Sequence, residues 1–416
     1  MLLFEKHRQS WEYLFNFLKW TFLGLLMGTI GGVLGAGFHH ALHFVTHVRA
    51  GHPWLIYLLP LGGLVSVLWY RLLKLQGKRG TNEIIEAALN GHWVKPQVAP
   101  GIFLATSITH LLGGSAGREG AALQLGGSAA SMLAKAFHLR EENRKLMVMA
   151  GMSAVFAGLF GTPLTATVFC MEFASVGTLF SPALLPCFLA AFTASRVSLM
   201  LGVHAETYLL DTAFDLSVPA FGKYLALAVL LSVLGIGMCT LFHKAEHFAC
   251  SRVKNPYVRS FAGGVLVAGM TAIAADQRFN GAGMDMALRA VAGEADWYSF
   301  LVKMLFTAVT LAAGFKGGEI VPTFCVGATF GCVFGGILGI DPGFAAALGL
   351  IGLFCCATNS PIASILLSIE MFSGTNVYVF AFVCVICFVL SGNYGLYASQ
   401  IIQFQKAAQV GKARNR

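Results

Sequence analysis

The sequence is poor in charged residues. Only 11% of its 416 residues are Asp, Glu, Lys or Arg, whereas 56% are hydrophobic, and the mean hydropathy is +0.72. A soluble domain usually carries about 25% charged residues. So few charges could not cover a compact water-soluble body of this size, so we predict an integral membrane protein. The same scarcity excludes a cytosolic enzyme, a secreted disulfide module and a nucleic-acid-binding protein.

Metal, disulfide and enzyme chemistry have little support. We interpret the ten cysteines as buried thiols, since Cys355 and Cys356, for example, are adjacent in an apolar run. We see no nucleophile triad, metal-protease motif or phosphate loop. The sequence therefore predicts no cofactor and no enzyme, and an intramembrane enzyme is the alternative from a different class.

A group of histidines near the end of the first long apolar run could suggest a metal site. No carboxylate is close to them in the sequence, and Arg49 is, so we predict interfacial histidines instead. The group comprises His39, His40, His43 and His47.

The basic residues indicate topology. The chain has 28 Lys and Arg against 19 Asp and Glu, a net charge of +9, and the bases cluster at the termini and in short loops. This pattern is typical of contact with anionic lipid headgroups. Residues 1–20 are aromatic and charged and predict an interfacial amphipathic helix. Two apolar runs, 21–48 and 54–70, are followed by a basic loop, which places the N-terminus in the cytoplasm. The short tail 405–416 is expected there too, with no cytosolic regulatory domain.

The later apolar runs have irregular lengths. Residues 121–134 are too few for a helix that crosses about 30 Å of hydrocarbon, whereas residues 146–196 suffice for more than one. The 48 glycines and 12 prolines of the chain interrupt most of these runs. We therefore predict an all-α polytopic bundle of half-length and tilted helices rather than a simple serpentine.

An internal repeat underlies this pattern. Gly161-Thr-Pro163 precedes Glu172, Asn359-Ser-Pro361 precedes Glu370, and the spacing from Pro to Glu is nine residues in both. A glycine-rich segment lies upstream of each proline, 113–121 and 314–322, at an offset of 201 residues. Two repeats, about 21–215 and 216–404, with broken helices are typical of a transporter whose site lies between the repeats. The alternative is chance similarity of glycine-rich membrane sequence.

Arg118 and Glu119 stand between Gly117 and Gly120 in an apolar region. A charge at bilayer depth costs about 2.5–3.5 kcal/mol on insertion scales, so such a residue is a functional candidate. Flanking glycines allow the backbone to break and expose N–H groups at a helix start, which is an anion site. Glu119 would then be a tethered anion that competes for this site. A structural Arg–Glu pair is the alternative.

These segments, taken together, resemble the CLC family of chloride channels and transporters. Gly117-Arg-Glu-Gly-Ala121 is similar to the family's gating motif Gly-Arg-Glu-Gly-Pro, and Gly318-Glu-Ile-Val-Pro322 is similar to Gly-x-Phe-x-Pro. Leu396-Tyr397-Ala398 resembles the segment with the anion-coordinating tyrosine. The motifs occur in family order, and the resemblance covers nearly the whole chain.

The resemblance implies an inverted-repeat fold, a homodimer and one anion pathway in each subunit. Glu119 would be the gate and proton acceptor, the backbone N–H groups of Ile320 and Val321 would line the central anion site, and the Tyr397 hydroxyl would donate to it. Tyr397 by itself would be read as an interfacial tyrosine. The implied partners are fluoride or chloride, protons and lipids, and the implied location is a bacterial inner membrane.

The family's first anion motif, Gly-Ser-Gly-Ile-Pro, is replaced here by residues 78–86, Lys-Arg-Gly-Thr-Asn-Glu-Ile-Ile-Glu. Gly80, Thr81 or Asn82 must substitute for the serine, and Thr81 and Asn82 are the favoured candidates. Bacterial fluoride/proton antiporters depart from the motif in the same way and lack the proline that Ala121 replaces here. The resemblance to this branch implies fluoride/proton exchange, with chloride/proton exchange or a passive chloride channel as alternatives.

A second departure concerns protons. The family's inner proton-carrying glutamate corresponds to Phe173 in this chain. Glu172, which precedes it, and its repeat mate Glu370 are expected to hold helix ends or the subunit interface. The proton of any exchange would then travel with Glu119 alone.

Overall fold

The computed structural model describes residues 2–77, 80–205, 207–208, 210, 215, 217–374, 376–403 and 406, with residues 2–10 described by backbone only. Lys78 and Arg79 of the departing motif, and the expected tail apart from Lys406, lie outside the described residues. Sixteen α-helices, two 3-10 helices and two strands of two residues each make up the regular structure of this part. The described chain is thus mainly helical, which confirms the predicted fold class.

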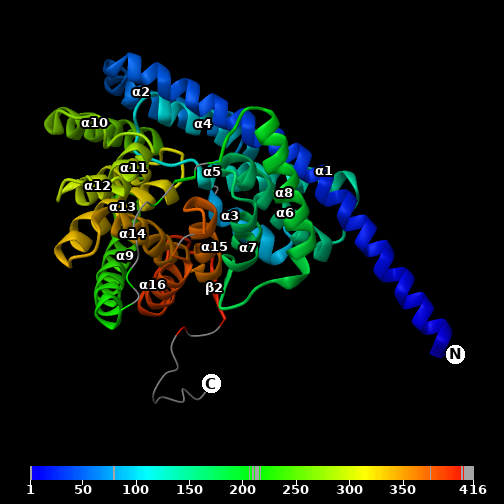
Figure 1. Cartoon of the computed structure of the whole chain (residues 1–416). Coiled ribbons are helices and arrows are strands. Elements are labelled where there is room, and N and C mark those ends of the chain that lie inside the picture. The colour runs from blue at the N-terminus through cyan, green and yellow to red at the C-terminus, as the bar shows by residue number, and fades with distance from the viewer. Residues whose placement is uncertain are drawn as a thin grey trace, which may run out of the picture.

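The α-helices form two sets of eight in the same order, which face each other in Figure 1. Helices α4 and α5 recur as α12 and α13 at an offset of 201 residues. The first set consists of α1 (Leu2–Gly51), α2 (Leu59–Leu72), α3 (Thr81–Asn90), α4 (Val98–Leu111), α5 (Glu119–Ala136), α6 (Glu141–Phe160), α7 (Pro163–Glu172) and α8 (Leu184–Met200). The second set consists of α9 (Val218–Arg252), α10 (Pro256–Ala274), α11 (Met284–Val291), α12 (Ser299–Ala312), α13 (Ile320–Ile337), α14 (Pro342–Thr358), α15 (Pro361–Met371) and α16 (Val377–Leu390).

The remaining elements are short. The 3-10 helices η1 (Pro53–Leu58) and η2 (Ser181–Ala183) precede α2 and α8. Strands β1 (Ser175–Val176) and β2 (Ile401–Ile402) pair in parallel and fix the C-terminal segment against the loop after α7. The last α-helix of the described chain ends at Leu390.

The helices have unequal lengths relative to a membrane. Six helical elements of the described chain are long and apolar enough to cross a membrane, and five further apolar helices are shorter. One of the shorter helices is α15, the repeat mate of α7. The long run 146–196 divides into most of α6, all of α7 and most of α8. The first break is at Gly161, whose φ of +71° favours glycine, and α7 then begins at Pro163. The prediction of broken, half-length helices is confirmed.

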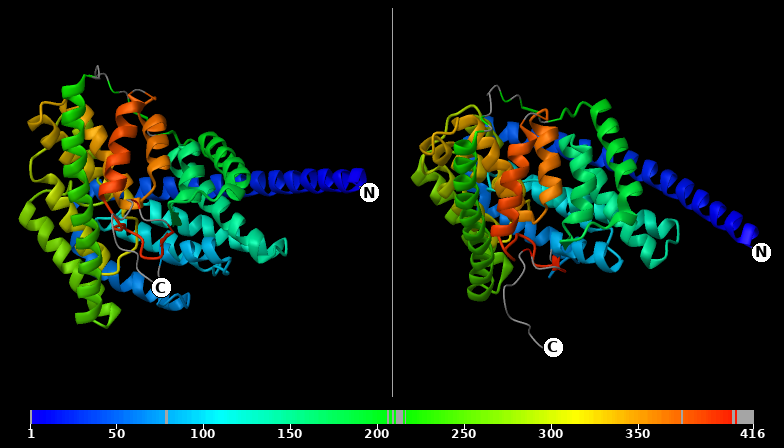
Figure 2. Two further views of the ribbon diagram at one scale, coloured as in Figure 1. Left: turned by 90° about the horizontal axis from the view of Figure 1, so that it is seen from below. Right: turned by 60° about the horizontal axis from the view of Figure 1, so that its bottom comes forward.

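Helix α1 is longer than the sequence analysis expects. It runs without a break from Leu2 to Gly51, a length of about 75 Å at 1.5 Å per residue, and its N-terminal part projects from the helical body (Figure 2). The expected boundary at residue 20 is not a break, because residues 2–23 contain neither Gly nor Pro. The interfacial placement of residues 1–20 stays a prediction.

Small residues allow the central helices to approach closely. A Cβ on Gly126 of α5 would lie 2.1 Å from the carbonyl oxygen of Gly151 on α6. In the second set, a Cβ on Gly327 of α13 would lie 2.3 Å from the carbonyl oxygen of Gly349 on α14. Such backbone contact between helices is typical of membrane proteins, where burial of apolar surface in lipid gives little driving force. The two contacts are repeat mates, so the same packing is built twice.

Two glutamates, Glu172, which is buried, and Glu370, which is half-buried, join the sets reciprocally. The Glu172 carboxylate, at the C-terminus of α7, accepts hydrogen bonds from the N–H groups of Ile362 (3.1 Å) and Ala363 (2.9 Å) at the start of α15. The Glu370 carboxylate, on α15, accepts from Leu164 (2.9 Å) and Thr165 (2.8 Å) at the start of α7. Each carboxylate thus satisfies N–H groups that a helix start leaves unpaired. The prediction that both glutamates hold helix ends is confirmed, and the exchange indicates a two-fold relation between the sets.

The cysteines are free thiols, nine of them buried. The prediction of burial is wrong for Cys250, which is exposed near the charged end of α9. Cys384 and Cys387 have the spacing of some metal sites, yet both lie in α16, where their backbone carbonyls accept from the thiols of Cys355 and Cys356. No group of three metal-ligating residues occurs in the described chain.

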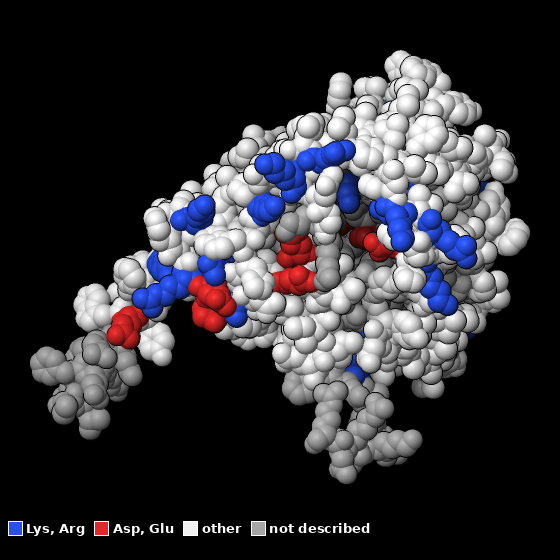
Figure 3. Space-filling view, turned by 180° about the vertical axis from the view of Figure 1, so that it is seen from behind, with Lys and Arg blue, Asp and Glu red and all other residues white. Residues whose placement is uncertain are grey.

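Figure 3 shows how the charges are distributed on one face. Lys and Arg gather around a central hollow that holds Asp and Glu, and much of the remaining surface carries no charge. A surface of this kind suits a protein surrounded largely by lipid.

The reciprocal bonds predict a loss of stability when a carboxylate is removed. Glu172→Ala would leave two N–H groups of α15 buried without acceptors, at a cost of about 1–3 kcal/mol, and Glu172→Gln, which keeps one acceptor, should cost less. The measurement is thermal unfolding of the detergent-solubilised protein. The control is Glu142→Ala, because the Glu142 side chain is 80% exposed. Equal unfolding temperatures for Glu172→Ala and the control would contradict the proposed role.

Candidate functional site

The two glycine-rich segments meet at the centre of the molecule. Gly117 and Gly318 exchange both backbone hydrogen bonds, with N···O distances of 2.6 and 2.8 Å, as an isolated antiparallel bridge. Helices α5 and α13 begin immediately after these glycines. The bridge therefore brings two helix N-termini, each with partial positive charge and unpaired N–H groups, to one place. An anion would be stabilised at this point.

The Glu119 carboxylate occupies this point. Glu119 is the first residue of α5 and has no solvent exposure. Its Oε2 accepts hydrogen bonds from the N–H groups of Arg118 and of Val321 on α13, both at 3.2 Å. Its buried Oε1 has no hydrogen-bond partner among the described residues. The carboxylate is thus a tethered anion that occupies an N–H donor predicted to bind the transported ion.

The glycines around the carboxylate leave no room for side chains. A Cβ on Gly117 would overlap Glu119 Oε2, and a Cβ on Gly318 would lie 2.7 Å from both Oε2 and the N atom of Gly120. A Cβ on Gly120 would lie 2.9 Å from Thr81 Oγ1. The glycines predicted from the motif are therefore required by close approach at the site.

Arg118 points away from this cluster. Its guanidinium carbon lies 5.0 Å from the centre of the Phe160 ring, and its Nη1 lies 3.4 Å from Nδ1 of His39. The backbone N–H of Arg118 donates to the Glu119 carboxylate. Arg118 therefore contributes a cation beside the site, on the side where α1 ends.

The structure separates the two favoured substitutes for the family serine. Gly80 precedes α3 with φ +62° and ψ −128°, a conformation open to glycine. The Thr81 hydroxyl lies at 3.4 Å from the carbonyl of Gly120, beside the gate segment. The Asn82 side chain instead accepts from the N–H of Ser399 at 3.0 Å. Thr81 thus faces the gate, whereas Asn82 holds the C-terminal segment.

Tyr397 is buried, with 5% of its surface exposed, and its ring contacts Phe173 edge-on at 5.6 Å. Its hydroxyl is buried without a hydrogen-bond partner in the described chain, and the charges of Glu319 and Glu119 act on it electrostatically. A buried, unsatisfied hydroxyl is costly unless a ligand or water completes it. Its position fits the predicted role as an anion donor.

The segment that carries Tyr397 is fixed by both sets of helices. Gln400 donates to the carbonyls of Phe173 (2.6 Å) and Thr358 (2.8 Å), and the Ser399 hydroxyl donates to Glu86 at 2.8 Å. Leu396 donates its N–H to the carbonyl of Ala357. The tyrosine is therefore held on a non-helical segment by several side chains.

Sequence reasoning missed the role of Glu319. This residue precedes α13, and its Oε2 is buried without a hydrogen-bond partner among the described residues. It is the repeat mate of Arg118, at the same offset of 201 residues that relates the glycine-rich segments. A second intramembrane charge at a repeat position was the available signal. The site therefore contains two carboxylates.

Lys303 was also missed, within a run read as apolar. It is fully buried on α12, and its Nζ donates to the carbonyl of Gly281 (2.7 Å), the carbonyl of Phe279 and the hydroxyl of Ser115 (both 3.0 Å). Ser115 belongs to the turn that leads into Gly117. Lys303 thus braces the first glycine-rich segment from the second set of helices, and a charge inside an apolar run was the signal for it.

Phe173 shows why the usual inner acid could not function here. Its ring has no solvent exposure and stacks on Phe169 at 4.7 Å. The adjacent Glu172 is engaged with α15, as described above. Neither side chain gives the site a free carboxylate on this side.

Comparison with known proteins agrees with this architecture. The family model described as "Voltage gated chloride channel" matches residues 61–392. The chain is 32% identical over 395 residues to a "Chloride/fluoride channel protein" of Pseudomonas syringae pv. tomato, covering 93% of this chain and 87% of that one. It is 25% identical to an "H(+)/Cl(-) exchange transporter" of Vibrio cholerae serotype O1, covering 86% and 82%.

Solved structures give the same result. A crystal structure of a CLC-type fluoride/proton antiporter superposes with a TM-score of 0.90 at 30% identity, over 94% of this chain and 99% of that one. A slow cyanobacterial Cl⁻/H⁺ antiporter, at 21% identity, shares the fold with a TM-score of 0.73 over 89% and 94% of the two chains. The chain therefore belongs to the CLC family, as a multi-pass membrane protein of anion transport rather than an enzyme.

Proposed function

We propose that this protein exchanges fluoride for protons across the membrane, with Glu119 as both gate and proton acceptor. The single observation that carries the proposal is the hydrogen bond from the Val321 N–H to Glu119 Oε2. An anion can take this donor only when the carboxylate leaves. A proton on Glu119 removes the charge that holds it against two helix N-termini, so protonation and anion binding are linked.

The choice of fluoride rests on the site and on the relatives. Fluoride is small and strongly hydrated, so its binding needs compact donors that replace the water shell. The Tyr397 hydroxyl, the N–H groups of Ile320 and Val321 and the Thr81 hydroxyl are such donors. The relatives at 30% and 32% identity carry fluoride in their names.

The proton route of this protein would lack the family's inner glutamate, because Phe173 stands at that position. Phe173 cannot relay a proton, so Glu119 must carry it to the central site. We infer that Glu319, whose Oε2 is buried without a hydrogen-bond partner among the described residues, is the next carboxylate to receive it. The protein would act as a homodimer with one such pathway in each subunit.

Chloride transport is the second candidate. Relatives at about 25% identity are named chloride/proton exchangers, and one relative is named a channel protein. A passive chloride channel would tolerate Phe173 in place of the inner acid. Coupled proton movement separates exchange from a channel, and the ratio of the two anion fluxes separates the substrates.

The first functional prediction concerns Glu119. Glu119→Gln should mimic the protonated gate, and Glu119→Ala should remove it, so both should abolish proton movement driven by an anion gradient. We expect Glu119→Ala to leave passive anion flux. The measurement is external pH and anion efflux from proteoliposomes. Glu172→Gln is the matched control, because this buried carboxylate lies outside the gate and should keep coupling. Coupled proton movement in either Glu119 variant would overturn the assignment.

The second prediction tests the close packing around the gate. Gly318→Ala places a methyl group 2.7 Å from Glu119 Oε2 and should keep the carboxylate from its seat. The number of protons moved per anion should therefore fall toward that of Glu119→Ala. Gly237→Ala is the control, because a Cβ there has no neighbour within 4 Å. Unchanged coupling in a folded Gly318→Ala protein would show that the carboxylate does not need this seat.

The third prediction concerns selectivity. Fluoride efflux should exceed chloride efflux by at least about tenfold, a difference of about 1.4 kcal/mol. Thr81→Ser, which restores the family serine beside the gate, should narrow this gap. Asn82→Ser should act more through the Ser399 segment that Asn82 holds. The control is Thr29→Ser on α1. Equal fluoride and chloride fluxes in the unmutated protein would move the assignment to chloride.

A further inference from the structure

A cavity lies next to the gate, at the end of α1. It has a volume of about 300 Å³, and its wall includes Val321, whose N–H binds the gate carboxylate. Its other walls come from the end of α1, the turn before α5 and the region around α11. By the topology argued from the basic loops, this is the outer side of the membrane. We call this cavity the vestibule, and two of its lining residues, Arg118 and Val321, donate their N–H groups to the gate carboxylate.

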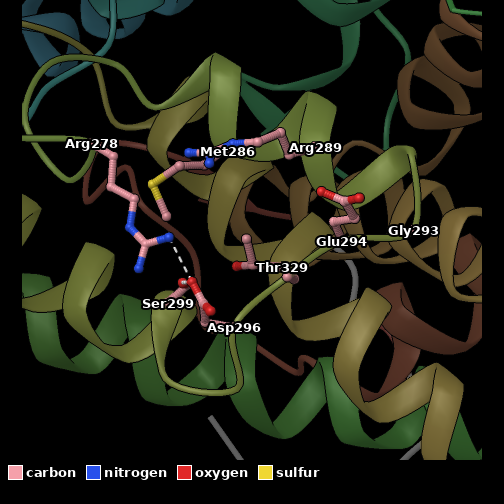
Figure 4. A pocket seen from close by; sticks show the side chains of 9 residues that line it. Arg278, Met286, Arg289, Gly293, Glu294, Asp296, Ser299 and Thr329 are labelled. Atoms are coloured by element: carbon pink, nitrogen blue, oxygen red, sulfur yellow. Dashed lines mark hydrogen bonds and ion pairs between the residues drawn. The ribbon is translucent and has the colours of Figure 1, made fainter.

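The vestibule is basic. Arg49, Arg118 and Arg289 line it, against one carboxylate, Asp285. Arg278 also lines it but forms ion pairs with Asp276 and Asp296. Figure 4 shows the ion pair with Asp296, which lies in the wall of a neighbouring cavity of about 420 Å³. Arg278 therefore adds little net charge. The remaining arginines give the vestibule a positive potential that attracts small anions.

Two histidines of α1 line the same vestibule. The rings of His39 and His43 lie parallel with their centres 6.4 Å apart, one helical turn from each other. Nδ1 of His39 faces Nη1 of Arg118 at 3.4 Å, and because a guanidinium only donates, Nδ1 must accept. This contact requires a neutral His39. Protonation would remove the acceptor and place a second cation against Arg118.

The other histidines nearby are engaged differently. His40 bonds through Nε2 to the carbonyl of Leu201, on another face of α1. His110 of α4 reaches the vestibule wall but is buried and bonded to the carbonyl of Gly117. His47 does not line the cavity. His39 and His43 are therefore the pair that can exchange protons with the vestibule.

We propose that His39, His43 and Arg118 form a proton-responsive outer site that holds a small monovalent inorganic anion before it displaces Glu119. Protonated imidazole and guanidinium repel each other, and an anion between them relieves this repulsion. The anion therefore binds more tightly to the protonated site, and by linkage the bound anion favours protonation. Because histidine changes charge between pH 5 and 8, the site strengthens as the pH falls through this range.

The proposal rests on the proposed function only in that anions pass Glu119, and the test uses whichever anion the protein moves. The half-saturating anion concentration is measured from initial fluoride efflux, and separately from chloride efflux, in proteoliposomes of the full chain. The pH is equal on both sides, at 7.5 or at 5.5, so that no proton gradient drives exchange. The readout, for each anion, is the half-saturating concentration at pH 7.5 divided by that at pH 5.5. A general loss of transport activity cancels in this ratio.

In the unmutated protein this concentration should be at least about threefold lower at pH 5.5, as expected for one or two added charges near the anion in a partly screened site. The double variant His39→Gln/His43→Gln should lower this ratio at least about twofold relative to the unmutated protein, and the pH dependence that Glu119 itself contributes remains in both proteins. The matched control is His40→Gln/His47→Gln on the same helix, which should keep the ratio of the unmutated protein.

Each outcome decides the proposal. The same ratio in the unmutated protein and in His39→Gln/His43→Gln would overturn it, as would a loss of the ratio in the control pair alone. If the double variant fails to fold, Arg118→Lys, which keeps the cation but shortens its reach to His39, gives a second test with the same expected fall in the ratio. Failure of the proposed function is a separate result, seen as equal fluoride and chloride fluxes or absent proton coupling in the unmutated protein.

Discussion

The pairing of Gly117 with Gly318 is the contact on which the rest of the structure depends. It places the first turns of α5 and α13 side by side in the interior, where few other groups could stabilise a negative charge. A backbone N–H carries no formal charge, so it binds an anion without holding it as strongly as a lysine would. Because a side chain at either glycine would fill the place of the Glu119 carboxylate, only glycine permits this pairing.

The surrounding scaffold is built twice and by the same contacts. The glutamates at the ends of α7 and α15 cap each other's helices, and the glycine contacts between α5 and α6 recur between α13 and α14. Symmetric contacts of this kind keep the two sets of helices in register. They also account for two carboxylates, one buried and one half-buried, that carry no proton in the mechanism proposed here.

The chemistry, in contrast, depends on positions where the repeats differ. The repeat mate of Glu119 is Ile320, that of Arg118 is Glu319, and that of Lys303 is Ile102. A symmetric framework therefore holds one gate carboxylate rather than two. The buried Lys303 stabilises the turn before this gate through Ser115. Its repeat mate Ile102 has no polar group with which to stabilise the corresponding turn of the second repeat.

The sequence by itself determined the class of protein and the repeat, and it pointed to Glu119 as the candidate gate. Three properties can be read from the sequence alone. They are the scarcity of charge, the interrupted apolar runs and the recurring spacing of glycine, proline and glutamate. The same patterns predicted that Glu172 and Glu370 hold helix ends or the subunit interface, and the structure shows that each holds the start of the other's helix. They did not predict that α1 is continuous. The charged residues before residue 20 resemble a separate surface helix, and no feature of the sequence shows that this segment and the following apolar run form one helix.

Only the tertiary structure decided which groups meet. Val321 and Glu119 are 202 residues apart, and a single backbone hydrogen bond over that distance leaves no periodic signal in the sequence. For the same reason, Thr81 and Asn82, adjacent in the chain, could not be separated until α3 placed one beside the gate and the other against Ser399. The contact of His39 with Arg118 arises where α1 crosses the turn before α5. Helix crossing, which depends on the packing of many small residues together, determines such contacts.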